Sequence, residues 1–256
     1  MPENDIDRRE IGQHDRREIG QHDRREIDQH DWREIDQHVA GASAAHQRLL
    51  AALDPPGDRG TTGVSDEMVG RPSRLPGWTV GHVLAHLALN AESFVNVIEA
   101  AERGECVRQY ASEAIRDSDI ERAHRRPATE HVATLRTSVY RLEGAWNRAR
   151  EAWVGAGLTI GGDRLPVVEI PMRRWREVEV HTVDLGIAEM SLDSFELWSN
   201  DYVRHDLRRL EMSYRARGSM GLVGLPAVVA GRSPRERLAW MLGRLDIEGA
   251  PRGEWP

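Results

Sequence analysis

Between residues 128 and 154, apolar side chains recur at alternating spacings of three and four residues. The apolar positions are Val132, Leu135, Val139, Leu142, Trp146, Ala149 and Trp153. Such a period is that of an α-helix with one buried face, and a seam of this length is typical of helical bundles. The pattern therefore predicts a long bundle helix over these residues.

Four further segments have helical patterns. Residues 39–54 are rich in alanine and leucine and stop at Pro55 and Pro56, which cannot continue a helix. After Thr79, a residue suited to an N-cap, the chain is apolar on nearly every side as far as residue 102, which predicts a helix inside a bundle. Residues 172–187 and 194–216 complete the set, so the fold is expected to be mainly α.

Shorter elements are predicted in the second half of the chain. Residues 157–171 alternate between apolar and polar types around Gly161 and Gly162, which predicts a short hairpin. The tail begins a helix at Ser233, with Pro234 in its first turn, and residues 245–249 (LDIEG) resemble a strand. We therefore expect a small C-terminal α/β subdomain over residues 206–256, after a helical bundle over residues 39–205.

Residues 7–38 are four tandem octads, namely DRREIGQH twice, DRREIDQH and DWREIDQH. Eight residues turn a helix by about 800°, so successive isoleucines drift by about 80° and share no buried stripe. We interpret residues 1–38 as a solvated arm without function, disordered or loosely helical. Its histidines could bind metal adventitiously; they are His14, His22, His30 and His38.

Composition excludes several classes of protein. The net charge is −7 and no basic cluster stands apart from acidic neighbours, which argues against a nucleic-acid partner. No apolar run approaches the roughly 20 residues of a membrane helix, and the N-terminus lacks the apolar core of a secretory signal. The single cysteine, Cys106, fits a reducing cytoplasm. We expect a cytoplasmic monomer or homodimer that does not bind membranes.

The helix predicted at residues 172–187 carries the most specific chemistry. Glu177, His181 and Asp184 follow one another at spacings of four and three, which places them within about 60° on one helix face. Apolar residues flank this stripe, whereas Arg176 and Glu179 lie on a face that looks solvated. Buried carboxylates and imidazoles need a partner, which is either a metal ion or a network with arginine side chains.

Two histidines on the helix that follows Thr79 add to this picture. His82 and His86 lie one turn apart on its apolar surface. A single buried histidine is usually a core residue that is satisfied by hydrogen bonds. Two on one helix, opposite a helix that turns Glu177 and His181 inward, favour a metal site shared between the helices.

The segments LPGWTVGHVLAHLALNAESFVNVIEAAERGE and RRWREVEVHTVDLG resemble the two signature stretches of the mycothiol-dependent maleylpyruvate isomerase family. The resemblance spans roughly residues 39–249 and excludes the octads. It implies a DinB-like, metal-binding four-helix bundle whose metal, Zn²⁺ or another divalent ion, is held by His86, Glu177 and His181. His82 is then a supporting or merely buried residue.

The same resemblance suggests two catalytic residues. Asp184 matches the aspartate of the family's H-x-x-D-L-G segment and is expected to orient His181 or a bound water. The tail segment ERLAWMLGRLDIEG resembles the family's C-terminal segment, in which an arginine contributes to the active site, and Arg244 is the best match. This tail is short, so Arg235 and Arg237 remain alternatives.

The reaction implied by the resemblance is a cis–trans isomerisation of a maleylpyruvate-like unsaturated acid. The thiolate of mycothiol, a small thiol cofactor, would add to the double bond, the resulting single bond would rotate, and elimination would release the trans acid. The partners are therefore a small electrophile and a low-molecular-weight thiol, and Cys106 has no catalytic role. The alternatives are a mycothiol S-transferase that acts on other electrophiles and a non-catalytic metal-binding protein.

Overall fold

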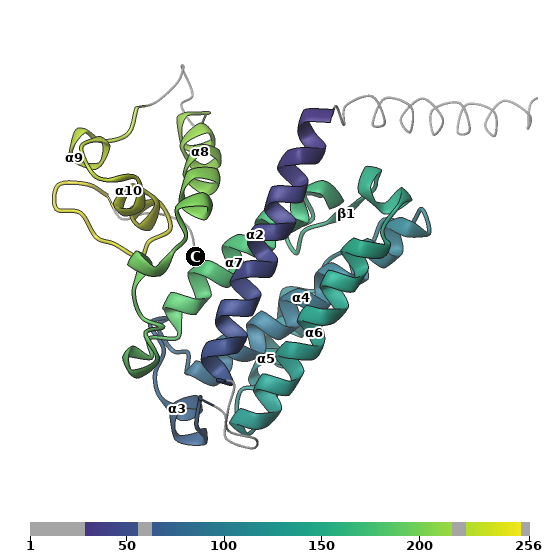
Figure 1. Ribbon diagram of the computed structural model, residues 1–256, viewed down its shortest axis with the longest axis horizontal. Helices are drawn as coiled ribbons and strands as arrows, with labels where there is room; N and C mark the ends of the chain where they lie inside the picture. Colours follow the sequence, from purple (N-terminus) through teal and green to yellow (C-terminus); the bar gives the residue numbers. More distant parts are fainter. Residues whose placement is uncertain (1–28, 56–62, 217–223, 252–256) are drawn as a thin grey trace, which may run out of the picture.

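Four long helices pack side by side in the computed structural model, which describes residues 29–55, 63–216 and 224–251 (Figure 1). They are α2 (Gln29–Leu53), α4 (Val80–Glu102), α6 (Ala128–Arg148) and α7 (Ile170–Asp184). Helix α4 packs mainly against α6, and α2 packs mainly against α7. The predicted mainly α, bundle-like fold is confirmed. No helix in the described ranges is both long and apolar enough to cross a bilayer.

Helix α6 follows the predicted apolar seam but ends earlier than its pattern. The six seam positions from Val132 to Ala149 are all buried. The helix stops at Arg148, and Trp153 lies in the short 3-10 helix η1 (Glu151–Val154). The carboxylate of Glu102 accepts hydrogen bonds from the backbone N–H groups of Arg150 and Ala152, both at 3.0 Å, and so stabilises the break.

Helix α4 begins at the predicted N-cap, Thr79. The backbone N–H of Thr79 donates to Nδ1 of His82 at 3.1 Å, which closes a capping box of the kind usually made by glutamate or glutamine. Most residues of α4 are buried, as its all-round apolar composition predicts. This helix is therefore central to the bundle.

Helix α2 begins at Gln29, inside the third octad, so the expected boundary between residues 38 and 39 falls within a continuous helix. The side chains of Ile35 and His38, from the last octad, are buried against the bundle. The interpretation of a solvated arm is therefore wrong for the last octad. Four copies cannot place their isoleucines on one buried helix face, but a single copy can bury its own isoleucine. Residues 1–28 lie outside the described residues.

Helix α7 is buried on both sides, which corrects the prediction of a solvated face. Glu179 pairs with Arg48 of α2 at 2.5 Å and accepts a hydrogen bond from the indole of Trp175. Arg176 pairs with the buried Asp206 of α8 (Asn200–Ala216). The face was misjudged because charged residues were taken to face water, whereas α2 and α8 cover it and supply partners of opposite charge.

The loops contain a predicted hairpin and two helices that the sequence patterns did not indicate. Strands β1 (Ala156–Leu158) and β2 (Arg164–Pro166) pair antiparallel, which confirms the hairpin. Helix α3 (Asp66–Gly70) lies between the first two predicted helices, and α5 (Glu113–Ala123) precedes α6. In α5 only Ile120 and Ala123 are buried, so its sequence has almost no apolar period.

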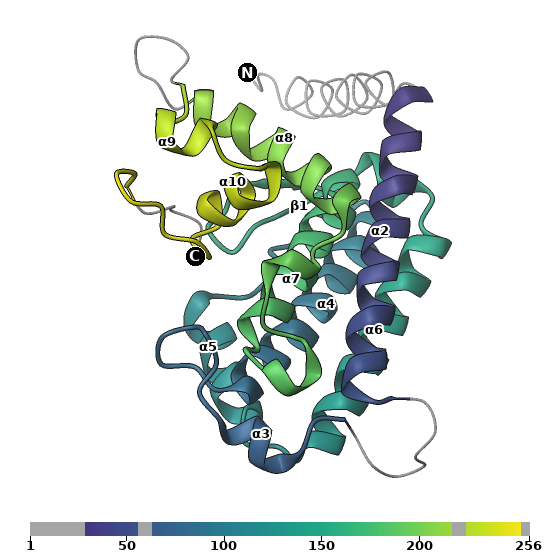
Figure 2. The same cartoon turned by 60° about the vertical axis from the view of Figure 1, so that its left-hand side comes forward.

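The C-terminal segments α8, α9 (Ala227–Ala230) and α10 (Pro234–Met241) lie together on one side of the bundle (Figure 2). The helix predicted to begin at Ser233 is present, and Ser233 forms a capping box with Glu236. The segment LDIEG forms turns, so the described part of the tail is helical and the strand of the expected α/β subdomain is wrong. Ile247 is nonetheless buried, which explains why an apolar residue stands between Asp246 and Glu248.

Candidate functional site

Helices α4 and α7 bring three of the predicted residues to one point. Nε2 of His86 lies 2.9 Å from Oε2 of Glu177, and Nε2 of His181 lies 3.4 Å from the same oxygen. The rings of His86 and His181 meet edge to face, with centroids 4.6 Å apart. One donor atom from each residue lies within 4.8 Å of the other two. The structure therefore assembles the expected set from residues far apart in the sequence.

These separations suit a metal ion of the zinc type. Bonds of about 2.0–2.2 Å to nitrogen and oxygen ligands in a tetrahedron imply ligand atoms about 3.4 Å apart. The two distances to Glu177 lie near that value. The other ring nitrogen of His86, Nδ1, is buried without a hydrogen-bond partner in the described part of the chain, so the described residues do not satisfy every polar atom of the site. Two imidazoles and a carboxylate are a donor set that zinc accepts.

The charges of the three groups are strongly coupled. Burial alone would raise the pKa of Glu177, but hydrogen bonds with His181 and His86 hold it well below its ordinary value. Burial would lower the pKa of His181, but its hydrogen bonds to Asp184 and Glu177 raise that pKa to about 9. Burial lowers the pKa of His86. In the protein without metal, His181 is thus a cation at neutral pH and His86 is a neutral imidazole.

Asp184 and Arg244 form a second layer behind His181. Nδ1 of His181 lies 2.8 Å from Oδ2 of Asp184, and Arg244 donates to both oxygens of that carboxylate, at 3.0 and 2.6 Å. The Asp184 carboxylate is almost fully buried. Burial alone would raise its pKa, but the hydrogen bonds from His181 and Arg244 lower it below its ordinary value. Arg244 therefore contacts the site through Asp184.

The two alternative arginines of the tail point elsewhere. Arg235 donates to the backbone carbonyl of Trp198 at 2.7 Å, and Arg237 pairs with Glu211 at 2.9 Å. Both contacts hold α10 against the segment before α8 or against α8 itself. Of the three predicted arginines, only Arg244 reaches the group around His181.

Arg174 is a member of the site that the sequence patterns missed. It is fully buried one turn before Glu177, and its Nη1 donates to the backbone carbonyl of Leu87 and to Oδ1 of Asn90, both at 2.9 Å. Its Nε donates to Nε2 of His46 on α2 at 2.9 Å. Burial lowers the pKa of Arg174 to about 10, so it remains charged at neutral pH. Its position on the same helix face as Glu177 could have indicated that it belongs to the site. It was missed because arginine is rarely buried, so an arginine is normally expected at the surface.

His82 and Cys106 lie apart from this group. His82 caps α4, its Nε2 lies 3.2 Å from Glu121, and its ring stacks on that of His124. This is the supporting role expected of a buried histidine. Cys106 is exposed in the segment after α4.

Comparisons with known proteins agree with the arrangement. The family model described as mycothiol maleylpyruvate isomerase N-terminal domain matches residues 39–186, more than half of the chain and the stretch that holds His86, Glu177 and His181. The crystal structure of a mycothiol-dependent maleylpyruvate isomerase superposes with a TM-score of 0.70 and 23% sequence identity over 87% of this chain and 96% of that one. A histidine-to-alanine mutant of such an isomerase gives a TM-score of 0.69, 22% identity and the same coverage. At these identities the likeness shows a shared fold. No curated protein sequence matches the chain.

Proposed function

Since the chain belongs to the mycothiol maleylpyruvate isomerase family, a family of enzymes, we propose that it catalyses the mycothiol-dependent cis–trans isomerisation of a maleylpyruvate-like unsaturated acid. The observation that carries this proposal is the convergence of His86, Glu177 and His181 within the matched stretch. A cytoplasmic location belongs to the same proposal and rests on the single exposed Cys106, which suits a reducing compartment.

We assign the three converging residues to a divalent metal, and zinc suits their donor atoms best. Three protein ligands leave one coordination position for a further ligand, as in catalytic zinc sites. When bound, the metal would stabilise the thiolate of mycothiol, and that thiolate would add reversibly to the double bond and so allow rotation about it. The protein itself then needs no nucleophile.

The remaining residues position this centre. Asp184 accepts a hydrogen bond from the Nδ1–H group of His181, so Nε2 of that ring is the nitrogen that would offer its lone pair to a metal ion. Arg244 holds the Asp184 carboxylate from the other side. We therefore propose that Asp184 and Arg244 act through His181.

Arg174 has a different part in the arrangement. Because it bonds to α4 and to α2 from its place on α7, it fixes the separation of the helices that carry His86 and Glu177. Its positive charge also lies within electrostatic range of the Glu177 carboxylate, which pairs with the imidazoles of His86 and His181. We propose that it is a positioning residue.

The proposal is tested by following conversion of the cis acid to the trans acid with zinc, with and without mycothiol. We expect conversion only with the thiol, and turnover undiminished without it would overturn the cofactor assignment. Glu177→Gln should reduce the rate by at least about 100-fold, more than removal of an outer-layer partner does. Glu189→Gln, an exposed neighbour paired with Arg71, is the matched control and should keep the parent rate.

The same assay separates the proposed isomerase from a transferase. An isomerase releases the thiol at the end of each turnover, whereas an S-transferase leaves it on the product. If the assay accumulates a stable adduct of mycothiol with the acid and no trans acid, the site catalyses conjugation. Stable adducts of mycothiol with other electrophiles would show the same.

A further inference from the structure

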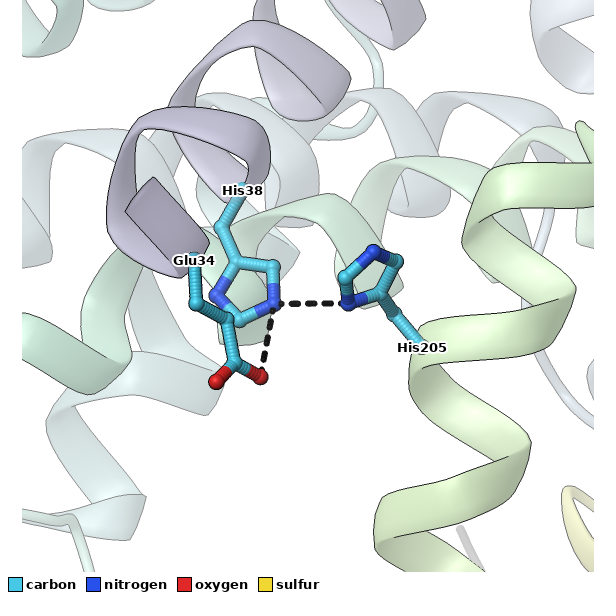
Figure 3. Close-up of side chains that lie close together, drawn as sticks. All are labelled: Glu34, His38 and His205. Atoms are coloured by element: carbon cyan, nitrogen blue, oxygen red, sulfur yellow. Dashed lines mark hydrogen bonds and ion pairs between the residues drawn. The ribbon is translucent and has the colours of Figure 1, made fainter. Parts of the chain in front are cut away.

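A second group of metal-type ligands lies where the start of α2 meets α8. Glu34 and His38 are one turn apart on α2, and His205 faces them from α8 (Figure 3). Nε2 of His38 lies 3.3 Å from Nδ1 of His205 and 3.6 Å from Oε1 of Glu34. As in the first site, one donor atom from each residue lies within 4.8 Å of the other two.

The geometry of this second group matches that of a tetrahedral metal site. Bonds of about 2.0–2.2 Å imply ligand atoms about 3.4 Å apart, and the two distances from His38 bracket that value. His38 is buried, whereas the side chain of Glu34 is 49% exposed. One side of the group therefore faces solvent, from which water ligands can complete the coordination of an ion.

The surroundings hold the two imidazoles in place. The indole of Trp175 lies against both rings, with centroids 6.4 Å from His38 and 6.0 Å from His205.

A third group of histidine and glutamate side chains uses most of its ring nitrogens in hydrogen bonds within the protein. His82, Glu121 and His124 also lie close together. However, Nδ1 of His82 takes part in the α4 cap, and the two nitrogens of His124 meet the Glu121 carbonyl and the Arg125 side chain. Its ring nitrogens are largely occupied by helix capping and local hydrogen bonds. By contrast, Nε2 of His38 faces both Nδ1 of His205 and the carboxylate of Glu34 (Figure 3).

The sequence sets the second group apart from the first site. Glu34 and His38 have the same Glu-x-x-x-His spacing as Glu177 and His181, and every octad repeats that pair. Glu34, His38 and His205 all lie outside residues 39–186, the stretch that the family model matches. This group is therefore not part of the matched domain.

We propose that Glu34, His38 and His205 form a second site for a divalent transition metal, which fastens the octad-bearing start of α2 to α8. An ion held by both helices links the first described residues of the chain to its C-terminal helices. The last octad then has a function that a solvated arm lacks. The site is distinct from the proposed catalytic centre and would stand if that centre had another activity.

The test is zinc stoichiometry of the full-length protein, measured by equilibrium dialysis and elemental analysis. We expect His205→Gln and Glu34→Gln each to lose one zinc per chain or to weaken it at least about tenfold. Because Glu34 is exposed, its variant keeps the test valid if loss of His205 disturbs folding. Glu177→Gln should lose the other zinc independently, so failure of one site is distinguishable from failure of the other.

His22→Gln is the matched control, because His22 occupies the octad position of His38 but belongs to an earlier copy. It should leave the stoichiometry unchanged. Parent stoichiometry and affinity in both the His205 and Glu34 variants would overturn the proposal, and would assign any additional zinc to adventitious binding by octad histidines.

Discussion

At the scale of single residues, His181 must change its charge when a metal binds. Its pKa of about 9 means that both ring nitrogens carry protons at neutral pH in the metal-free protein. A metal ion needs the lone pair of Nε2, so the proton there has to leave, whereas the proton on Nδ1 stays with Asp184. Metal affinity therefore depends on pH over a range set by this residue.

We expect zinc uptake at pH 7 to release about one proton, and apparent affinity to fall about tenfold for each unit below pH 9. Calorimetric titration in two buffers of different ionisation enthalpy measures the number released. The Glu34→Gln variant is used so that only the site at His181 contributes. An affinity that is constant between pH 7 and pH 9 would contradict the proposed charge of His181.

Asp184→Asn tests the layer behind His181. The amide keeps the size of the side chain but loses the charge that pairs with Arg244 and fixes His181. We expect zinc affinity to fall about 10–100-fold and the free energy of unfolding to fall by about 3–5 kcal/mol, because the buried Arg244 loses the negative charge of Asp184. Asp193→Asn, which disturbs only a long and partly exposed ion pair with Arg74, should change neither value by much. Binding and chemical denaturation measure the two effects.

The sequence predicted the residues of the site well, but it did not predict how their side chains pair with one another. Helical spacing was enough to put Glu177, His181 and Asp184 on one stripe, because that depends on local geometry. The pairing of Asp184 with Arg244, 60 residues away, depends on how the tail folds back, which no local pattern contains. Only the family resemblance indicated Arg244 in advance.

At the scale of helices, the close approach of α2 and α7 depends on Gly41. A Cβ atom placed on Gly41 would lie inside the van der Waals radius of the Trp175 ring, which is held between helices. Alanine normally stabilises a helix by about 1 kcal/mol relative to glycine. Here the overlap is expected to outweigh that gain.

Gly41→Ala should therefore lower the free energy of unfolding by about 1–3 kcal/mol, in the range for overpacked cores. Gly144→Ala on α6 is the matched control, since its Cβ would meet only the flexible end of Arg148. It should be neutral or stabilise the protein by up to about 1 kcal/mol. Equal effects of the two substitutions in urea denaturation would contradict close packing at Gly41.

The contact between α7 and α8 rests on an ion pair. Arg176 binds both oxygens of Asp206, which is fully buried and also accepts a hydrogen bond from the hydroxyl of Tyr202 at 2.9 Å. Asp206→Asn should cost about 3–5 kcal/mol, because it leaves the guanidinium without its countercharge. Asp201→Asn removes an exposed pair on the same helix and should change stability by less than about 0.5 kcal/mol. Denaturation midpoints compare the two variants.

The predictability of each helix depended on how much of its surface is apolar. Helices α4 and α6 bury long faces, so their apolar residues recur with the helical period and the elements were predicted. Helix α5 buries Ile120 and Ala123 alone, and its sequence is that of a polar loop. In the tail, Ile247 is buried from an irregular segment between two acidic residues, which mimics the alternation of a strand.

At the scale of the whole molecule, the proposed centre joins distant parts of the chain. His86 and Glu177 are 91 residues apart in sequence and come together only when α4 packs against α7. The unfolded chain does not hold its three ligands in one place. A metal ion held by these ligands would therefore bind the folded protein in preference and stabilise it.

With free zinc at about 100 times its dissociation constant, one site contributes about 2.7 kcal/mol, which for a chain of this length raises Tm by about 5–10 °C. The measurement is a thermal melt with zinc and after chelation, in the Glu34→Gln background. Adding Glu177→Gln should abolish the shift, because it removes the carboxylate that lies between the two imidazoles. An equal shift in both proteins would mean that zinc stabilises the chain elsewhere, and that α4 and α7 do not share an ion.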